Sequence, residues 1–136
     1  MKITADTNIL LRAAIRDEPD QARSAARLLR EAETIAVTLV ALCEFAWVLR
    51  QGYRRTTREV HGMISQLIRS SSVAIDRPAV EAGLEMLEAG GDFADGVIAF
   101  EGRRLGGSVF ASFDRAVIRL VAATGGETRL LGAGEE

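Results

Sequence analysis

The stretch Lys2-Ile3-Thr4-Ala5-Asp6-Thr7-Asn8-Ile9-Leu10-Leu11 decides the fold of this chain. Its first residues, 3–5, form a short and mostly apolar run that is typical of a buried strand. Asp6 ends this run, and Thr7 or Asn8 can cap a helix that begins near Ile9. The pattern therefore places a carboxylate at the carboxyl end of a first strand. That edge is where open α/β sheets bind their ligands.

Composition narrows the class of protein. The chain has 136 residues, 48% of them hydrophobic, and a net charge of -2, which fits one globular domain over residues 1–136. No apolar run approaches the ~18 residues of a membrane span, and the N-terminus does not resemble a signal peptide, so we expect a cytoplasmic protein without membrane contact. Cys43 is the only cysteine, which excludes an internal disulfide and a cysteine zinc site.

Short β-type runs alternate with helical patterns along the chain. After the first strand, further strands are predicted at 34–38, 71–75, 108–111 and 128–131. Helices are predicted at 9–16, from Pro19 or Asp20 onward, at 39 to about 51, at 56 or 57 to 68, from Asp76 to the Gly90-Gly91 pair, at 92–105 and at 114–123. This alternation predicts a single α/β domain with a largely parallel sheet covered on both faces.

Four carboxylates stand at strand ends or in apolar surroundings. Asp6 and Asp114 each follow a predicted strand and precede a helix. Glu44 is the only charged residue in the apolar segment 39–49, and Asp95 lies in the first turn of a predicted helix. As a set they offer only oxygen ligands, which select hard cations such as Mg²⁺ or Mn²⁺.

Three of these acids also have a simpler interpretation. Asp114 can be a helix cap, and Asp95 can pair with Asp92 in a capping box. Glu44 can lie on a solvated face or pair with an arginine.

Nearly all basic residues of the chain are arginines, since Lys2 is the only lysine. Two causes, which can both hold, explain this excess of arginine: a GC-rich genome, and recognition of phosphate by the planar arginine fork.

Taken together, the motifs resemble those of PIN-domain ribonucleases, most closely the VapC toxins of bacterial type II toxin–antitoxin pairs. The matching segments, in the family's order, are 5–11, 42–49, 92–95 and 112–115. The resemblance implies a PIN-like three-layer α/β/α domain with a mostly parallel central sheet. Gly96 departs from the family, where a helix former such as alanine is commoner, at a helix cost of up to ~1 kcal/mol. The implied acidic, catalytic and metal-binding quartet is Asp6, Glu44, Asp95 and Asp114, with Asn8 and Ser112 as supporting polar groups.

The same resemblance implies an activity and partners. The activity is metal-dependent hydrolysis of RNA phosphodiester bonds by water, with Mg²⁺ (or Mn²⁺) as cofactor. We expect Asp6 and Asp95 to be direct ligands, and Glu44 and Asp114 to bind through water or a second ion. The implied partners are an RNA substrate, for which transfer RNA is one class, a VapB-like antitoxin and a second copy in a homodimer. The candidate RNA-binding residues are Arg12, Arg16 and Arg115. Each of them can instead be an ordinary solvent-exposed surface residue.

Two other classes of function compete with the nuclease. The first is a non-catalytic PIN-like binding module whose acidic cluster serves partner binding. The second is phosphoryl transfer by a receiver domain or a phosphatase. A receiver needs a distal lysine, and Lys2 is the only one. A phosphatase of the Asp-x-Asp type needs an acid where Asn8 stands, so the pattern disfavours both.

Overall fold

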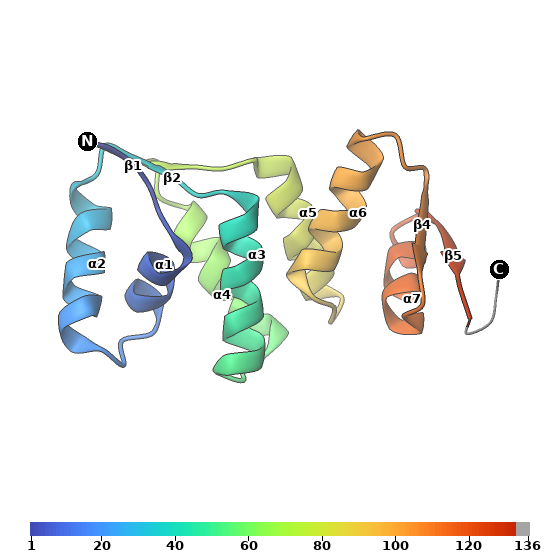
Figure 1. The fold of residues 1–136 in the computed structure, drawn as a ribbon, viewed down its shortest axis with the longest axis horizontal. Helices are drawn as coiled ribbons and strands as arrows, with labels where there is room; N and C mark the ends of the chain where they lie inside the picture. The colour runs from blue at the N-terminus through green and yellow to red at the C-terminus, as the bar shows by residue number, and fades with distance from the viewer. Residues whose placement is uncertain (133–136) are drawn as a thin grey trace.

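Strands and helices alternate along the chain, as Figure 1 shows. The structure is a computed structural model that describes residues 1–132. Its strands are β1 (Lys2–Thr4), β2 (Thr34–Ala36), β3 (Val73–Ala74), β4 (Val109–Ser112) and β5 (Glu127–Leu130). Its helices are α1 (Thr7–Ala14), α2 (Pro19–Glu31), α3 (Leu39–Trp47), α4 (Thr57–Ile68), α5 (Arg77–Glu88), α6 (Phe93–Arg104) and α7 (Arg115–Ala123). Helix α3 continues into one π-helical turn, η1 (Val48–Gly52).

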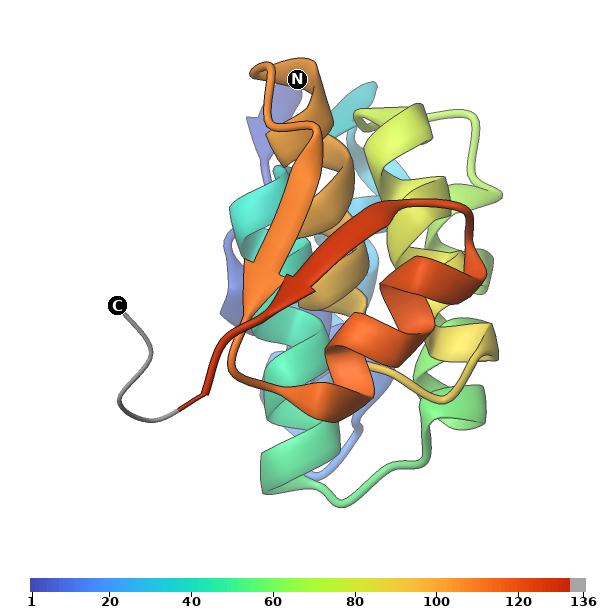
Figure 2. The ribbon, with the colours of Figure 1, turned by 90° about the vertical axis from the view of Figure 1, so that its right-hand side faces the viewer.

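All strand pairs in residues 1–132 are parallel, which confirms the predicted α/β class. The strands are divided, however, between a sheet of order β1-β2-β3 and a separate pair β4-β5. Figure 1 shows β4, α7 and β5 at one end of the long axis and β1 at the other, and Figure 2 views the molecule from the end that carries β4 and β5. Within the described residues, β1 and β4 therefore each keep one edge without a strand partner.

The main hydrophobic core lies between the three-stranded sheet and the helices α1, α3, α4, α5 and α6. Ile35 from β2 and Phe45 from α3 are both 2% exposed, and Ile64 from α4 is fully buried. Burial of each such side chain contributes about 1.5–3 kcal/mol. Val121 of α7 is buried but does not belong to this core. The core thus fixes the first sheet and the helices up to α6, while β4, α7 and β5 pack mainly on one another.

Helices α5 and α6 approach closely because each carries a glycine at their contact. A Cβ added at Gly96 would overlap the carbonyl oxygen of Ala82 and lie 2.8 Å from the Cβ of Met86. A Cβ added at Gly83 would lie 2.5 Å from the Phe93 ring. The glycine that departs from the family pattern therefore has a packing role, which the propensity argument alone did not reveal.

This packing predicts opposite effects for two glycine substitutions in α6. We expect Gly96→Ala to lower the free energy of unfolding by about 1–3 kcal/mol, because the added methyl overpacks the α5–α6 contact. A matched control is Gly102→Ala, where an added Cβ meets nothing within 4 Å and helix propensity should raise stability by about 0.5–1 kcal/mol. Urea unfolding of both variants measures the difference. A Gly96→Ala protein as stable as Gly102→Ala contradicts the close packing.

Candidate metal-binding site

Asp6 occupies the carboxyl end of β1 and also begins α1. Its Oδ1 accepts a hydrogen bond from the backbone N–H of Asn8 at 2.7 Å, so Asp6 itself is the N-cap. The predicted caps, Thr7 and Asn8, are wrong by one or two residues, because the extended backbone of Asp6 (φ -76°, ψ 160°) already allows capping there. Asp6 is exposed, and within residues 1–132 its Oδ2 accepts no hydrogen bond. That oxygen is free to bind a ligand.

Glu44 faces the same pocket as Asp6. The pocket holds about 480 Å³ and is also lined by Thr7 and Asn8. Glu44 Oε1 accepts a hydrogen bond from Thr7 Oγ1 at 3.4 Å, a role of Thr7 that the sequence pattern did not single out. No arginine in residues 1–132 pairs with Glu44, so the ion-pair alternative is not observed. Its exposed position fits the solvated alternative as well as a ligand role.

Helix α3, which carries Glu44, is only partly buried although its sequence is almost entirely apolar. Val40 is 71% exposed and Trp47 is 65% exposed, whereas Leu42 and Phe45 enter the core. The helix therefore has a buried face and an exposed face, and the Glu44 side chain is exposed to solvent. This arrangement removes the need for a buried partner to the Glu44 carboxylate.

Asp95 lies in the first turn of α6 and is partly buried. Burial raises the pKa of its carboxyl, and the negative charges of Asp92 and Asp114 raise this pKa further. The predicted capping roles are not observed, because Asp92 makes no side-chain cap hydrogen bond. The Asp92 carboxylate lies instead 3.7 Å from the Nε of Arg50, an ion pair that was not predicted.

Asp114 begins α7 just as Asp6 begins α1. Its Oδ1 accepts hydrogen bonds from the backbone N–H groups of Ala116 at 2.9 Å and Val117 at 3.2 Å. The Oγ of Ser112 in turn accepts from the N–H of Asp114 at 2.9 Å. The capping alternative for Asp114 and the turn role of Ser112 are thus both observed. Because Asp114 is exposed and caps with one oxygen, a ligand role for the other oxygen remains compatible with this geometry.

The structure brings the four acids together in two pairs. Asp6 and Glu44 share one pocket, and Asp95 and Asp114 are near enough for their charges to interact. Within residues 1–132, no group of three or more acidic, histidine or cysteine side chains can hold a metal ion. The expected convergence of all four acids is therefore not observed, because β1 and β4 lie in separate sheets.

The Asp6–Glu44 pair has the donor chemistry of a magnesium site. Mg²⁺ is commonly held by one or two carboxylates and completes its shell with water and substrate phosphates. Asp6 and Glu44 offer two carboxylates on an open pocket, which leaves room for those further ligands. We therefore regard this pocket as the candidate metal site.

The predicted RNA-binding arginines differ in their surroundings. Arg12 Nη1 lies 3.2 Å from Asp17 Oδ1, so its charge is already paired. Arg115 is exposed and forms no ion pair in the described part of the chain. Arg16 is exposed and borders two pockets. The arginines therefore do not form one patch around the acids.

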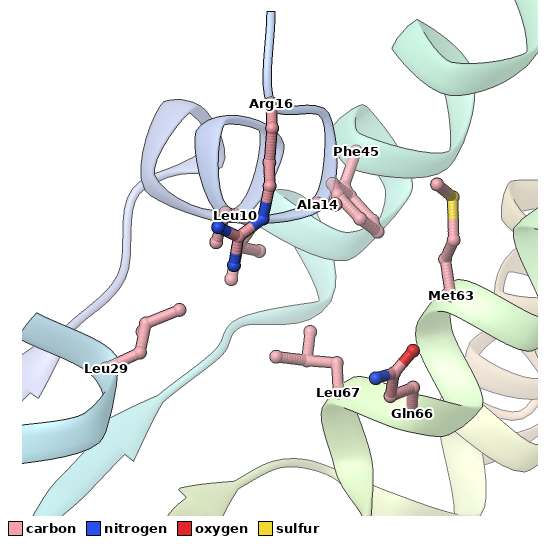
Figure 3. A pocket seen from close by; sticks show the side chains of 9 residues that line it. Leu10, Ala14, Arg16, Leu29, Phe45, Met63, Gln66 and Leu67 are labelled. Atoms are coloured by element: carbon pink, nitrogen blue, oxygen red, sulfur yellow. The ribbon is translucent and has the colours of Figure 1, made fainter. Parts of the chain in front are cut away.

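A second pocket, of about 370 Å³, is mainly apolar (Figure 3). Leu29 from α2, Leu10 from α1 and Phe45 from α3 contribute to it, and Met63 and Leu67 reach it from α4. Figure 3 shows the guanidinium group of Arg16 extended among these side chains. The pocket thus combines an apolar lining with one cationic group.

Comparisons with known proteins identify one matching family. No helix in residues 1–132 combines the length and apolar character needed to cross a membrane. Among curated proteins, none matches the chain significantly. The PIN domain family matches residues 3–123, a range that includes all four acids and confirms the predicted PIN-like α/β/α fold. The chain therefore belongs to the PIN domain family.

Proposed function

We propose that this protein is a Mg²⁺- or Mn²⁺-dependent endoribonuclease and the toxin of a type II toxin–antitoxin pair. PIN domains are generally metal-dependent nucleases, so family membership supports nuclease-type chemistry. The observation that carries the metal proposal is the Asp6–Glu44 pair on one open pocket at the carboxyl end of β1. The choice of RNA, and of the toxin role, rests on the sequence resemblance.

Four polar residues of the pocket have proposed roles. Asp6 caps α1 with Oδ1, which leaves its Oδ2 to hold a cation, while the Thr7 hydroxyl orients the Glu44 carboxylate. Asp6 and Glu44 would together hold a divalent cation, which when bound would supply an activated water and offset charge on the phosphodiester. The side chain of Asn8 lines the same pocket and can hydrogen-bond a phosphate oxygen or the attacking water. Together these groups place water and phosphate beside each other.

We further propose that Asp95 and Asp114 complete the site when β4 pairs with the free edge of β1. Asp6 follows the last residue of β1 by two positions, and Asp114 follows the last residue of β4 by two positions. A parallel register that sets Thr4 opposite Ser112 therefore sets Asp6 opposite Asp114. Adjacent strands lie about 4.8 Å apart, so the two carboxylates would reach one ion.

This closure predicts a specific disulfide. In a Cys43→Ala background, we expect Thr4→Cys and Ser112→Cys to form a cross-link under mild oxidation, because neighbouring strands meet the geometry of a disulfide. A matched control places the second cysteine at Leu130, which lies opposite Ser112 in β5, one strand further away. Gel electrophoresis without reductant distinguishes a link within one chain from a link between two copies. Equal cross-linking of both pairs, or none, contradicts the proposed register.

The apolar pocket supports the proposal of a protein partner. Its lining suits the apolar face of a helix, and Arg16 suits a carboxylate on that helix. We propose that a VapB-like antitoxin inserts such a helix there and that the toxin forms a homodimer. A small DNA-binding protein encoded beside this gene, co-purifying with the chain, is the expected finding. A partner that binds equally well to a Leu67→Asp variant contradicts this docking site.

The experiment that tests the proposed activity is RNA cleavage by the purified protein. We expect cutting of a structured RNA in Mg²⁺ or Mn²⁺ and none after chelation by EDTA. The alternative is the non-catalytic binding module, which the separation of the two acidic pairs favours. That alternative predicts intact RNA at every metal concentration. Sequencing of the 5′ ends of cellular RNA after expression then identifies the substrate, for which transfer RNA is one candidate class.

A further inference from the structure

An open hollow on the outer side of α2 is lined mainly by arginines. It holds about 650 Å³, and its lining contains Arg16, Arg23, Arg27 and Arg30 with Asp20 as the only acid. In Figure 1, α2 lies at the end of the molecule opposite β4 and β5. The charge of this lining is therefore positive, although the chain as a whole is slightly negative.

The arginines of this face are available to a ligand. Helix α2 buries Ala22 and Ala25 on its inner side, where it packs on α1. The side chains of Arg23 and Arg27 are 70% and 72% exposed and pair only with exposed acids of the same helix. Exposed pairs of this kind are weak, so a phosphate can displace the acid. Arg30 forms no ion pair in the described part of the chain.

The spacing of these arginines suits a polyanion. Positions 23, 27 and 30 recur at helical intervals and fall on one face of α2. Seven residues of helix span about 10 Å, so the row of guanidinium groups is long enough to contact more than one phosphate of a strand. The planar arginine fork binds phosphate oxygens in bidentate fashion. A single small anion would use only part of this row.

A groove between α1 and α2 borders both the arginine hollow and the candidate metal site. It shares Asp20 and Ser24 with the arginine hollow. The same groove shares Asn8 with the pocket that contains Asp6 and Glu44. A chain laid along α2 can therefore reach the acids without crossing the apolar pocket.

We propose that Arg23, Arg27 and Arg30 bind the phosphate backbone of the RNA and guide the strand toward the Asp6–Glu44 pocket. This inference rests on the proposed function, because it needs RNA as the substrate. It assigns the main RNA contacts to α2, which the sequence pattern did not single out. Arg16, a predicted RNA-binding residue, lies at the border of this face.

The test is salt-dependent binding of a single-stranded RNA oligonucleotide, measured in an Asp6→Asn background so that the RNA stays intact. We expect replacement of Arg23, Arg27 and Arg30 by glutamine to weaken binding about tenfold or more and to reduce the salt slope by about 2, since each phosphate contact on a single strand contributes about 0.7. The matched control replaces three exposed arginines outside this face, Arg58, Arg69 and Arg77, and should leave the slope unchanged.

The outcomes separate this inference from the proposed function. If the wild-type protein cuts RNA while both triple variants bind equally, the α2 face is not the RNA surface and the nuclease proposal stands. If the wild-type protein neither binds nor cuts RNA, both fail. If the α2 variant loses affinity for a poly-glutamate peptide but keeps its RNA affinity, the face serves an acidic protein and the inference is overturned.

Discussion

Asp6→Asn should lower RNA cleavage by more than about a hundredfold without unfolding the protein. Loss of a group that only supports a metal ligand typically lowers metal affinity or activity 10–100-fold, and loss of a ligand itself should lower activity more. The fold should survive, because asparagine is as good an N-cap as aspartate and its Oδ1 can accept the same hydrogen bond from Asn8. The substitution therefore removes the charge while it keeps the start of α1.

A charge-matched control separates the pocket from general electrostatics. Glu81 lies exposed in α5, does not line the candidate metal pocket and forms no ion pair in residues 1–132. Glu81→Gln makes the same change in net charge, and we expect wild-type cleavage from it. Single-turnover assays in Mg²⁺, with circular dichroism to verify folding, provide the comparison. Wild-type cleavage by folded Asp6→Asn would remove Asp6 from the mechanism.

Asp95→Asn should have two opposite effects. The first effect is on activity: cleavage should fall by more than about a hundredfold, because Asp95 is a proposed member of the metal site. Without metal, however, the substitution should make the protein more stable at pH 7. The pKa of Asp95 is raised by burial and then by Asp92 and Asp114, so the ionised carboxylate is less favourable in the folded chain than in the unfolded one.

The sign of the pH dependence follows from this raised pKa. Between the ordinary carboxyl pKa and the raised value, the folded protein binds more protons than the unfolded chain, so stability falls as pH increases. The loss is complete above the raised pKa. Thermal unfolding in EDTA should therefore show a higher Tm for Asp95→Asn at neutral pH and a smaller difference below pH 4. A lower Tm for the variant at neutral pH contradicts the proposed repulsion.

The secondary structure could be predicted closely because its signals are local. Helix α4 begins at Thr57, within the predicted range, and Asp76 and Asp114 cap the helices that follow them. The pairing of β4 could not be predicted in this way. The pattern of hydrophobic residues indicates that Val109 to Ser112 can form a strand. It does not identify the neighbouring strand, because strand pairing depends on contacts between residues that are distant in sequence.

The candidate site could be predicted in part for the same reason. Asp6 and Glu44 meet because β1 and α3 both belong to the main core, which apolar patterning specifies. The place of Asp114 depends on how β4 docks, which no local signal fixes. The role of Gly96 was also inaccessible, because it depends on the distance between α5 and α6. Propensity scales describe one helix at a time.

The most direct measurement of the central claim is calorimetric titration of Mn²⁺ into the metal-free protein, without RNA. The account predicts saturable binding by the wild-type chain, and an affinity at least about tenfold lower for Asp6→Asn and for Glu44→Gln, since each removes one carboxylate ligand. Glu81→Gln should bind like the wild type. Undetectable binding by the wild-type protein, or equal affinity in all four proteins, would show that these two carboxylates do not hold a metal.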